Sequence, residues 1–344
     1  MKIKILTFYF ADNYGAVLQT YALQGALNKI GCEALVSNYI PSTMQYESKI
    51  SSLKDLLYFH TKKKIHDRFE LFRRKYLNIS MDSLSENDVY VAGSDQIWNL
   101  DITKNDYTYY LDFNNNDKSF YYAASIGKSD YNDSQFEKVK KYLLRNNNIS
   151  VREKSFCSSL NKRINDKKIN YVLDPTLLHD SNFWRNIELK PKLPNGIDKY
   201  VLVYMINFDD NVINIAKKIA KELNIKVLFI NNSFKKMFDE NVYNVRLVDP
   251  SNFIWLFDNS TYVCTNSFHG TCFSILFQKS FCVVPHKERG ARMVDLLNDL
   301  SLSSCLYSDD FVVSRKINYN IPNLKLDELR DLSYQFIKKS LYKE

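Results

Sequence analysis

Glycine and proline are scarce in this sequence, with 8 and 7 residues among 344, whereas tyrosine and phenylalanine are abundant, with 24 and 22. This composition excludes a collagen-like, disordered or low-complexity chain. The glycine-rich motif GxGxxG of dinucleotide-binding folds is also missing. We therefore expect a globular protein, and the length favours two domains over one.

The six cysteines are scattered along the chain and form no CxxC pair. This spacing excludes a disulfide framework and a zinc ribbon. Cys264, His269 and Cys272 lie close in sequence, but they are spread over a predicted strand, turn and helix. We expect no metal site and no cofactor, and we interpret the cysteines as small core residues.

Long apolar runs are missing as well. The N-terminal residues MKIKILTFYFADN contain too short an apolar run for a signal peptide, and no segment approaches the length of a membrane span. The expectation is a cytoplasmic protein, with a place at the inner face of the membrane left open.

The formal net charge is +8, and much of it lies in local runs such as residues 62–64 and 73–75. Runs of this kind are most often solvated helix faces. The overall charge fits an anionic ligand, an acidic polymer or a membrane surface. No nucleic-acid fingerprint accompanies it, so we expect no nucleic-acid partner.

Short apolar strands alternate with helices in both halves of the chain, which predicts two α/β domains facing each other across a cleft. Pro191, Pro194 and Gly196 mark residues 190–199 as the linker. The predicted domains are thus residues 1–189 and 190–344, the second ending in a C-terminal helix that packs back. Strands are predicted over residues 3–8, 34–39, 89–93, 120–125, 149–152, 200–206, 226–230, 243–248, 262–265 and 281–284.

Residues 42–80 are predicted to form a helical insertion that is polar, basic and aromatic. Two interpretations stay open for its aromatic side chains. They pack the helix against the rest of the chain, or they form an amphipathic surface for a lipid-linked acceptor.

Polar residues follow the predicted strands of the first half, where parallel sheets bind ligands. The turn Asp12, Asn13 and Tyr14 follows the first strand. Residues 94–98 follow a later strand, and Asp95 with Trp98 suits a sugar site; the alternative is a helix cap with Trp98 in the core. Arg152 ends a strand and is suited to bind a carboxylate or phosphate, unless it forms a surface ion pair with Glu153 or Asp174.

The second half contains a buried strand, a polar turn and an apolar helix in the segment YVCTNSFHGTCFSILFQK, residues 262–279. A helix N-terminus favours an anion, so Ser267 is a candidate for substrate binding, and Gly270 would let a ligand approach the backbone. His269 is placed to hold an anion or to deliver a proton to it. The alternative is an ordinary turn with Ser267 as a helix cap and a half-buried histidine.

Basic residues follow the next predicted strand, and they have two interpretations. Lys287, Arg289 and Arg292 are placed to close over a phosphate, or they belong to a solvated basic loop.

Six segments of the chain resemble the polysaccharide pyruvyl transferase family. They are DNYGAVLQTYAL (12–23), VYVAGSDQIWN (89–99), YYAASIG (121–127), ISVREKS (149–155), VLDPTLL (172–178) and TNSFHGTCFSILFQK (265–279). The most specific signal is SxRE followed by DPTLL and then TxSFHG. Residues 42–80 and the C-terminal tail match nothing in this pattern.

The resemblance implies a fold like the two-domain GT-B glycosyltransferases and a site in the interdomain cleft. It implies transfer of pyruvate from the co-substrate phosphoenolpyruvate to two hydroxyls of one sugar, or of a lipid-linked glycan, as a cyclic ketal. Arg152 and His269 match family positions and are expected opposite each other. The family often has Asp where this chain has Glu153. Asp95 is the first candidate for the base and Asp12 the second.

Two other functions stay open at this point. A GT-B sugar-nucleotide glycosyltransferase would share the fold and the anion-binding helix, and it would need an acidic group for the nucleotide ribose near residues 287–289. A non-catalytic binding protein of a glycan-assembly complex would tolerate the loss of Arg152 and His269.

Overall fold

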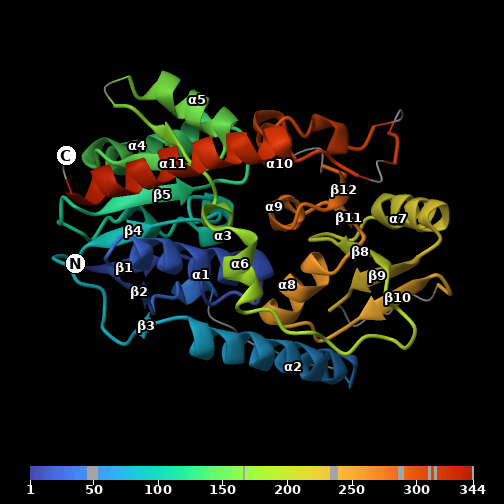
Figure 1. Cartoon of the computed structure of the whole chain (residues 1–344). Helices are drawn as coiled ribbons and strands as arrows, with labels where there is room; N and C mark the ends of the chain where they lie inside the picture. Colours follow the sequence, from blue (N-terminus) through green and yellow to red (C-terminus); the bar gives the residue numbers. More distant parts are fainter. Residues whose placement is uncertain are drawn as a thin grey trace. The chain divides into compact units, whose positions relative to one another are not determined.

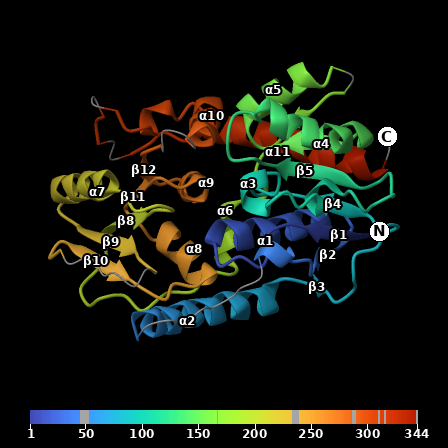
Figure 2. The same cartoon turned by 180° about the vertical axis from the view of Figure 1, so that it is seen from behind.

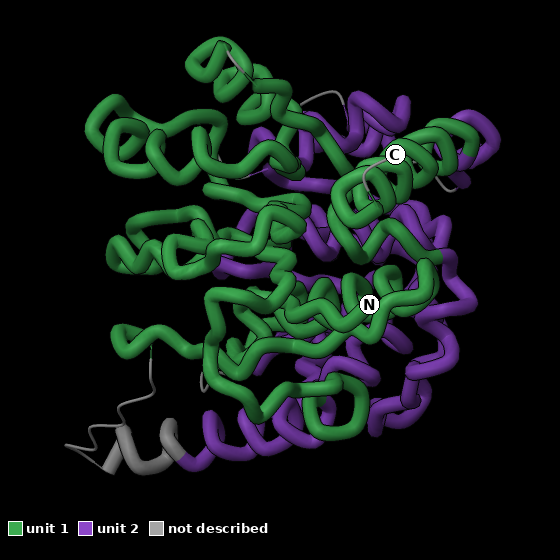
Figure 3. The backbone as a smooth tube through the Cα atoms, turned by 90° about the vertical axis from the view of Figure 1, so that its left-hand side faces the viewer, with its two compact units in different colours: residues 1–46, 73–179, 324–344 green, residues 47–72, 180–323 purple. Residues whose placement is uncertain are grey.

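The computed structural model describes residues 1–44, 53–165, 167–232, 239–285, 290–308, 311–313 and 316–342, and for residues 53–59 the helix but not the side chains. The chain forms two compact units. Residues 1–46, 73–179 and 324–344 make up the first, and residues 47–72 and 180–323 the second (Figure 3). These units differ from the predicted domains 1–189 and 190–344 over residues 47–72, 180–189 and 324–344. The predicted linker, residues 190–199, contains neither helix nor strand.

The first unit is built on a seven-stranded sheet with the order β3-β2-β1-β4-β5-β6-β7 (Figure 1). Every ladder in it is parallel. The direction of winding reverses between β1 and β4, and ligands of such sheets bind at the carboxyl ends of the strands beside that reversal. The strands are β1 (Lys2–Leu6), β2 (Glu33–Ser37), β3 (Ile79–Ser80), β4 (Tyr90–Ala92), β5 (Phe120–Ala124), β6 (Ile149–Val151) and β7 (Asn170–Tyr171).

The second unit is built on a five-stranded parallel sheet with the order β10-β9-β8-β11-β12. Its winding reverses between β8 and β11, whose last residues Tyr204 and Thr265 are paired. The strands are β8 (Tyr200–Tyr204), β9 (Lys226–Ile230), β10 (Val242–Val245), β11 (Tyr262–Thr265) and β12 (Ser280–Val283). The prediction of an α/β chain with two Rossmann-like sheets is confirmed.

The helices follow the strands in alternation, as the sequence predicted (Figures 1 and 2). In the first half of the chain they are α1 (Tyr14–Lys29), η1 (Ser42–Met44), α2 (Leu53–Tyr76), α3 (Leu100–Thr103), η2 (Thr108–Tyr110), α4 (Asp133–Arg145), α5 (Lys154–Arg163) and η3 (Pro175–Leu178). In the second half they are α6 (Ser181–Arg185), α7 (Asp210–Leu223), α8 (Pro250–Asp258), α9 (Phe268–Leu276), α10 (Ala291–Asp299), η4 (Ser303–Cys305) and α11 (Asn320–Tyr342).

The central strands of both sheets are buried along their whole length. The segments YVA of β4, FYYAA of β5 and YVLVY of β8 contain no exposed residue. Helices cover both faces of a parallel sheet, so such strands are continuously apolar rather than alternating. Because these strands are buried, polar side chains reach the solvent from the loops at their carboxyl ends.

The C-terminal helix α11 packs back onto the first sheet, as predicted. Figures 1 and 2 both show it running beside β5 and α4. The ring of Phe336 lies 6.2 Å from that of Phe120 and 6.4 Å from that of Tyr122. The Leu173 N–H donates to Ser333 Oγ at 3.0 Å, and the Arg330 guanidinium donates to Leu177 O at 2.7 Å.

The predicted insertion contains one long helix, α2. Phe69 and Phe72 on it are buried, which favours packing over a lipid-facing surface for these two residues. Leu71 is 67% exposed. Of the basic runs, residues 62–64 are solvated as expected, but Arg73 is buried and pairs with Asp12.

Candidate active site

The turn after β4 is tied to β1 and α1 by buried hydrogen bonds. Thr7 Oγ1 donates to Ser94 O at 3.1 Å, Gln19 Nε2 donates to Thr7 Oγ1 at 2.9 Å, and the Ser94 N–H donates to Gln19 Oε1 at 3.3 Å. Gly93 has a φ of +140°, and a Cβ there would lie 1.8 Å from Tyr122 O. Only glycine therefore fits where the chain turns toward Asp95.

Asp95 occupies the carboxyl edge of the first sheet, beside the winding reversal. Its φ is +68°, and its Oδ1 accepts from the Gln96 N–H at 2.8 Å. The side chain keeps 15% of its surface exposed, and its Oδ1 lies 3.6 Å from Arg152 Nη2. A carboxylate that is fixed in position and still partly exposed can serve as a general base.

Arg152 follows β6 and is enclosed by carboxylates. Its Nη1 lies 2.7 Å from Asp174 Oδ2 and its Nε 3.5 Å from Glu153 Oε1, and none of its side chain is exposed. Burial acts to lower the pKa of Arg152, but the charges of Asp174, Glu153 and Asp95 outweigh burial and raise that pKa. The ion pair considered as an alternative in the sequence is thus present, and it is buried rather than at the surface. For Arg152 to bind a donor anion directly, one of these carboxylates would have to be displaced.

Glu153 is held by Ser125, which follows the neighbouring strand β5. Ser125 Oγ donates to Glu153 Oε1 at 2.5 Å and accepts from the Gly127 N–H at 3.0 Å. A bulge in β5, where Ala123 has a φ of +51°, precedes Ser125. Such bulges re-aim the side chains that follow them. Glu153 thus links the end of β6 to the end of β5 through this serine.

The cluster around Arg152 contains three carboxylates and one guanidinium, which leaves a surplus of negative charge. A second anion would be repelled there, whereas a hydroxyl group that donates to a carboxylate would be bound. This edge of the first sheet therefore suits an acceptor hydroxyl.

Ser94, Ser125 and Asp174 belong to the cluster and were not predicted as site residues. The sequence could have indicated these three residues, because they stand at or near the ends of the motifs VYVAGSD, YYAAS and VLDP.

The predicted turn Asp12, Asn13 and Tyr14 lies at the start of α1. Asp12 Oδ1 pairs with Arg73 Nη2 at 3.0 Å. Asn13 is the helix cap, and its side chain accepts from the Ala16 N–H at 3.3 Å. Tyr14 is buried. These contacts hold the turn in place beside β1, and they give Asn13 and Tyr14 structural roles.

The proposal that Trp98 stacks on a sugar is wrong. Its indole is fully buried, lies parallel to the ring of Tyr110 at 5.2 Å, and donates from Nε1 to Tyr109 O at 3.3 Å. Ser94 and Asp95 cap no helix either, because α3 begins at Leu100 with Asn99 as its cap. The tryptophan is part of the core beneath the loop.

The turn before α9 lies at the winding reversal of the second sheet, and its local structure follows from Thr265 and Ser267. Thr265 Oγ1 donates to Tyr204 O at 2.7 Å and accepts from the Ser267 N–H at 3.0 Å. Ser267 caps the helix by accepting from the Gly270 N–H at 3.3 Å. The helix cap at Ser267, which the sequence offered as the alternative to substrate binding, is present.

Gly270 is needed for a different reason from the one the sequence indicated. A Cβ at this position would lie 2.3 Å from Thr265 Oγ1. The space above Gly270 is therefore filled by the threonine side chain, and the glycine N–H is used by Ser267. Gly270 lets the helix approach β11 closely rather than letting a ligand approach the helix.

His269 lies in the first turn of α9, with 7% of its surface exposed. Its ring meets that of Phe268 edge-on, with the centroids 5.4 Å apart. The guanidinium of Arg292, from the first turn of α10, lies over the same Phe268 ring at 5.3 Å. The structure thus brings a guanidinium and an imidazole to the N-terminus of one helix, where the dipole favours negative charge.

Lys287 and Arg289 lie outside the described residues. Within the described part of the chain, no group of three His, Cys, Asp or Glu side chains is arranged to hold a metal ion. Among the described helices, none is long and apolar enough to cross a membrane. The expected meeting of Arg152 and His269 across a cleft stays a prediction.

Residues 13–288 match the family model described as polysaccharide pyruvyl transferase. The matched part covers most of the chain and includes both edges described above. The chain belongs to this family, and it is therefore a transferase. The comparison with curated proteins found no match.

Solved structures resemble the chain only loosely. Phytolacca americana UGT2 in complex with UDP-2-fluoro-glucose and pterostilbene has a TM-score of 0.47 at 11% identity and covers 100% of this chain and 99% of its own. The MnaA–UDP structure from S. aureus has a TM-score of 0.49 at 11% identity, with 98% and 91% covered. UDP-GlcNAc 2-epimerase from Methanocaldococcus jannaschii has a TM-score of 0.44 at 11% identity, with 96% and 92% covered.

Proposed function

We propose that the protein transfers the pyruvyl group of phosphoenolpyruvate to two hydroxyls of one sugar, forming a cyclic ketal in a surface polysaccharide or its lipid-linked precursor. The observation that carries this proposal is the contact of both Arg292 and His269 with the ring of Phe268 at the N-terminus of α9. Phosphoenolpyruvate has a phosphate and a carboxylate, and such a cationic helix end is the kind of site that binds them.

The donor is assigned to the second unit. Arg292 binds an anionic group of phosphoenolpyruvate through charge-assisted hydrogen bonds, with its guanidinium held by the Phe268 ring. His269 delivers the proton that the enol methylene carbon takes up, or donates to the departing phosphate. Lys287 stays a candidate for a further phosphate contact.

The acceptor is assigned to the first unit, where the carboxylates of the Arg152 cluster suit hydroxyl groups. Asp95 takes the proton of the first sugar hydroxyl as its oxygen bonds to the central carbon of the protonated donor. The bond from that carbon to the phosphate oxygen then breaks. The second hydroxyl closes the ring, and its proton leaves with the phosphate. Arg152 acts by fixing Asp95 rather than by touching the donor.

The proposal is tested by incubating the purified protein with phosphoenolpyruvate and glycan fragments from the organism's own surface polysaccharide. We expect release of phosphate together with a product heavier than the acceptor by one pyruvate less water. A protein that binds a nucleotide sugar and shows neither phosphate release nor this mass change would contradict the proposal.

A further inference from the structure

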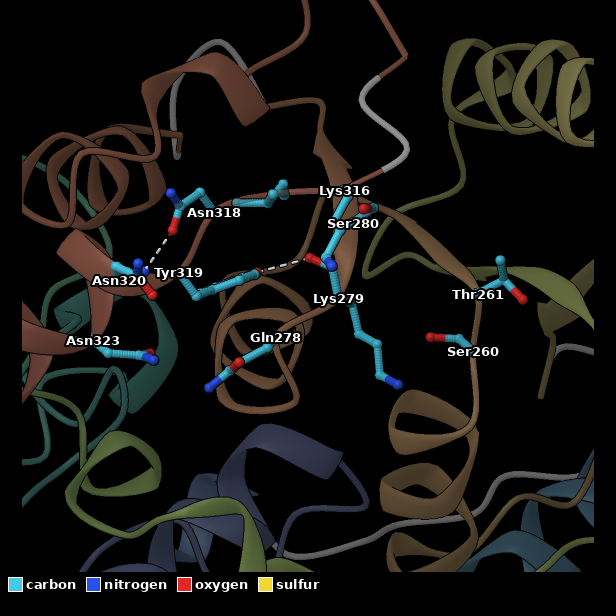
Figure 4. Close-up of a pocket in the computed structure, with 11 residues that line it drawn as sticks. Ser260, Thr261, Gln278, Lys279, Ser280, Lys316, Asn318, Tyr319, Asn320 and Asn323 are labelled. Atoms are coloured by element: carbon cyan, nitrogen blue, oxygen red, sulfur yellow. Dashed lines mark hydrogen bonds between the residues drawn. The ribbon is translucent and has the colours of Figure 1, made fainter.

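A polar cavity of about 740 Å³ lies within the second unit, away from the N-terminus of α9. Figure 4 shows its lining residues, which come from three segments: residues 260–261 before β11, residues 278–280 at the start of β12, and residues 316–320 and 323 before and within the first turn of α11. Because β11 and β12 begin here, the cavity lies at the amino edge of the second sheet. The nine residues of α9 separate it from His269 by about 13 Å along the helix.

The lining consists of hydrogen-bonding side chains with two lysines, and Ile317 is its one aliphatic residue among the described ones. Gln278 and Asn320 are exposed and Asn323 is half-exposed, and their side-chain amides make no hydrogen bond within the described chain. A surface of this kind offers nothing to an acyl chain or a nucleobase, which need apolar walls. Amides with free donors and acceptors suit the hydroxyl groups of a sugar.

The charges around the cavity favour a negative ligand. Lys279 and Lys316 line it. Lys279 donates to Asp258 O, and burial lowers its pKa. The nearby Asp258 is paired with Arg185, at 2.7 and 3.0 Å. Among the described residues that line the cavity, two are lysines and none is a carboxylate, and Lys316 is exposed.

The cavity is held in shape by the start of α11. Tyr319 is buried, and its hydroxyl donates to Lys279 O at 2.7 Å. The Asn320 N–H donates to Asn318 Oδ1 at 2.9 Å, which fixes the first turn of the helix. These bonds join two of the three lining segments, so the cavity walls are preorganised (Figure 4).

We propose that this cavity binds a carboxylated segment of the glycan, as an anchoring site separate from the reaction centre. The inference rests on the proposed function, because a pyruvyl ketal leaves a carboxylate on each sugar that is modified. A polymer carrying such units would be retained at the cavity while another unit reacts. Lys316 meets the carboxylate, and Gln278 and Asn323 meet the sugar hydroxyls.

The test is calorimetric titration of the full chain, without donor, with a hexuronic acid tetrasaccharide, the matching neutral tetrasaccharide and inorganic phosphate. We expect the acidic tetrasaccharide to bind tightest and to bind Lys316→Gln at least tenfold more weakly. Lys226→Gln, an exposed lysine at the same sheet edge, should bind as the unmodified chain does.

Equal binding of the acidic and neutral tetrasaccharides, phosphate binding as tight as the acidic sugar, or an unaffected Lys316→Gln variant would each overturn the inference. Arg292→Met separates this inference from the proposed function, because it should lose donor binding and keep the acidic tetrasaccharide. If phosphoenolpyruvate is never consumed but Lys316→Gln still loses the acidic tetrasaccharide, the proposed function fails and the binding site stands.

Discussion

The guanidinium of Arg292 lies over the ring of Phe268, 5.3 Å from its centroid. The two residues come from different helices, and the same ring meets the imidazole of His269 edge-on, so both side chains lie at the N-terminus of α9. A guanidinium stacked on an aromatic ring is held in a fixed place by a cation–π contact. We propose that this place binds the donor.

Replacing His269 with Asn should lower kcat by about 10²- to 10⁴-fold, the usual effect of removing a general acid. Steady-state phosphate release measures kcat of both enzymes. His60→Asn, at an exposed position of α2, is the control and should behave as the unmodified enzyme. An unchanged kcat in His269→Asn would remove the histidine from the chemistry.

Asp95→Asn should lower kcat by about 10²- to 10⁴-fold and leave the affinity for the donor unchanged, because the residue acts on the acceptor hydroxyl. The free energy of unfolding of the variant is measured alongside, so that a loss of fold is distinguished from the loss of the base. Asp101→Asn, an exposed carboxylate, serves as the control. Retained turnover in Asp95→Asn would assign the base to another group.

Arg152→Met should destabilise the fold by about 3–5 kcal/mol, because it leaves buried carboxylates without their cation. The loss should be smaller at pH 5 than at pH 8, since protonation removes the unpaired charges. Chemical denaturation at the two pH values measures it. The exposed pair Lys128–Asp101 gives the comparison, and Lys128→Met should cost less than about 1 kcal/mol. A stable Arg152→Met enzyme with weakened donor binding would contradict this account and would support the role expected from the sequence, in which Arg152 binds a carboxylate or phosphate of the donor.

Gly93→Ala should destabilise the fold by at least about 3 kcal/mol, because its Cβ meets a backbone oxygen at 1.8 Å. Gly31→Ala also has a positive φ, at +88°, but its Cβ has open space and should cost only about 1–2 kcal/mol. Thermal unfolding of both variants gives the comparison. Equal losses would mean that backbone conformation alone, and not contact with Tyr122, requires glycine at position 93.

The sequence predicted the strands well where they are short, apolar and closely bounded. The strands Lys226–Ile230 and Tyr262–Thr265 begin and end where the pattern predicted. Polar residues that follow the predicted strands could be identified as site candidates, because the ends of strands are where such residues reach the solvent. The helix cap at Ser267 also follows from local sequence.

The partners of these residues were less predictable, because they depend on long-range contacts. Arg152 meets Asp95 only because β4 and β6 flank β5 in the sheet. Trp98 has the composition of a sugar platform, yet Tyr110 covers its ring. Gly270 was read as an opening for a ligand, but the space is taken by Thr265, which lies on the other side of the turn.

The most direct test of the donor site is the dissociation constant of phosphoenolpyruvate for the unmodified enzyme and for Arg292→Met, measured by calorimetry. A charge-assisted hydrogen bond contributes about 1.5–3 kcal/mol, so the variant should bind the donor more weakly by about 10- to 150-fold. Its unfolding free energy should change by no more than about 1 kcal/mol, because the half-exposed stack on Phe268 contributes little. Unchanged affinity in a folded Arg292→Met protein would contradict the placement of the donor at the N-terminus of α9.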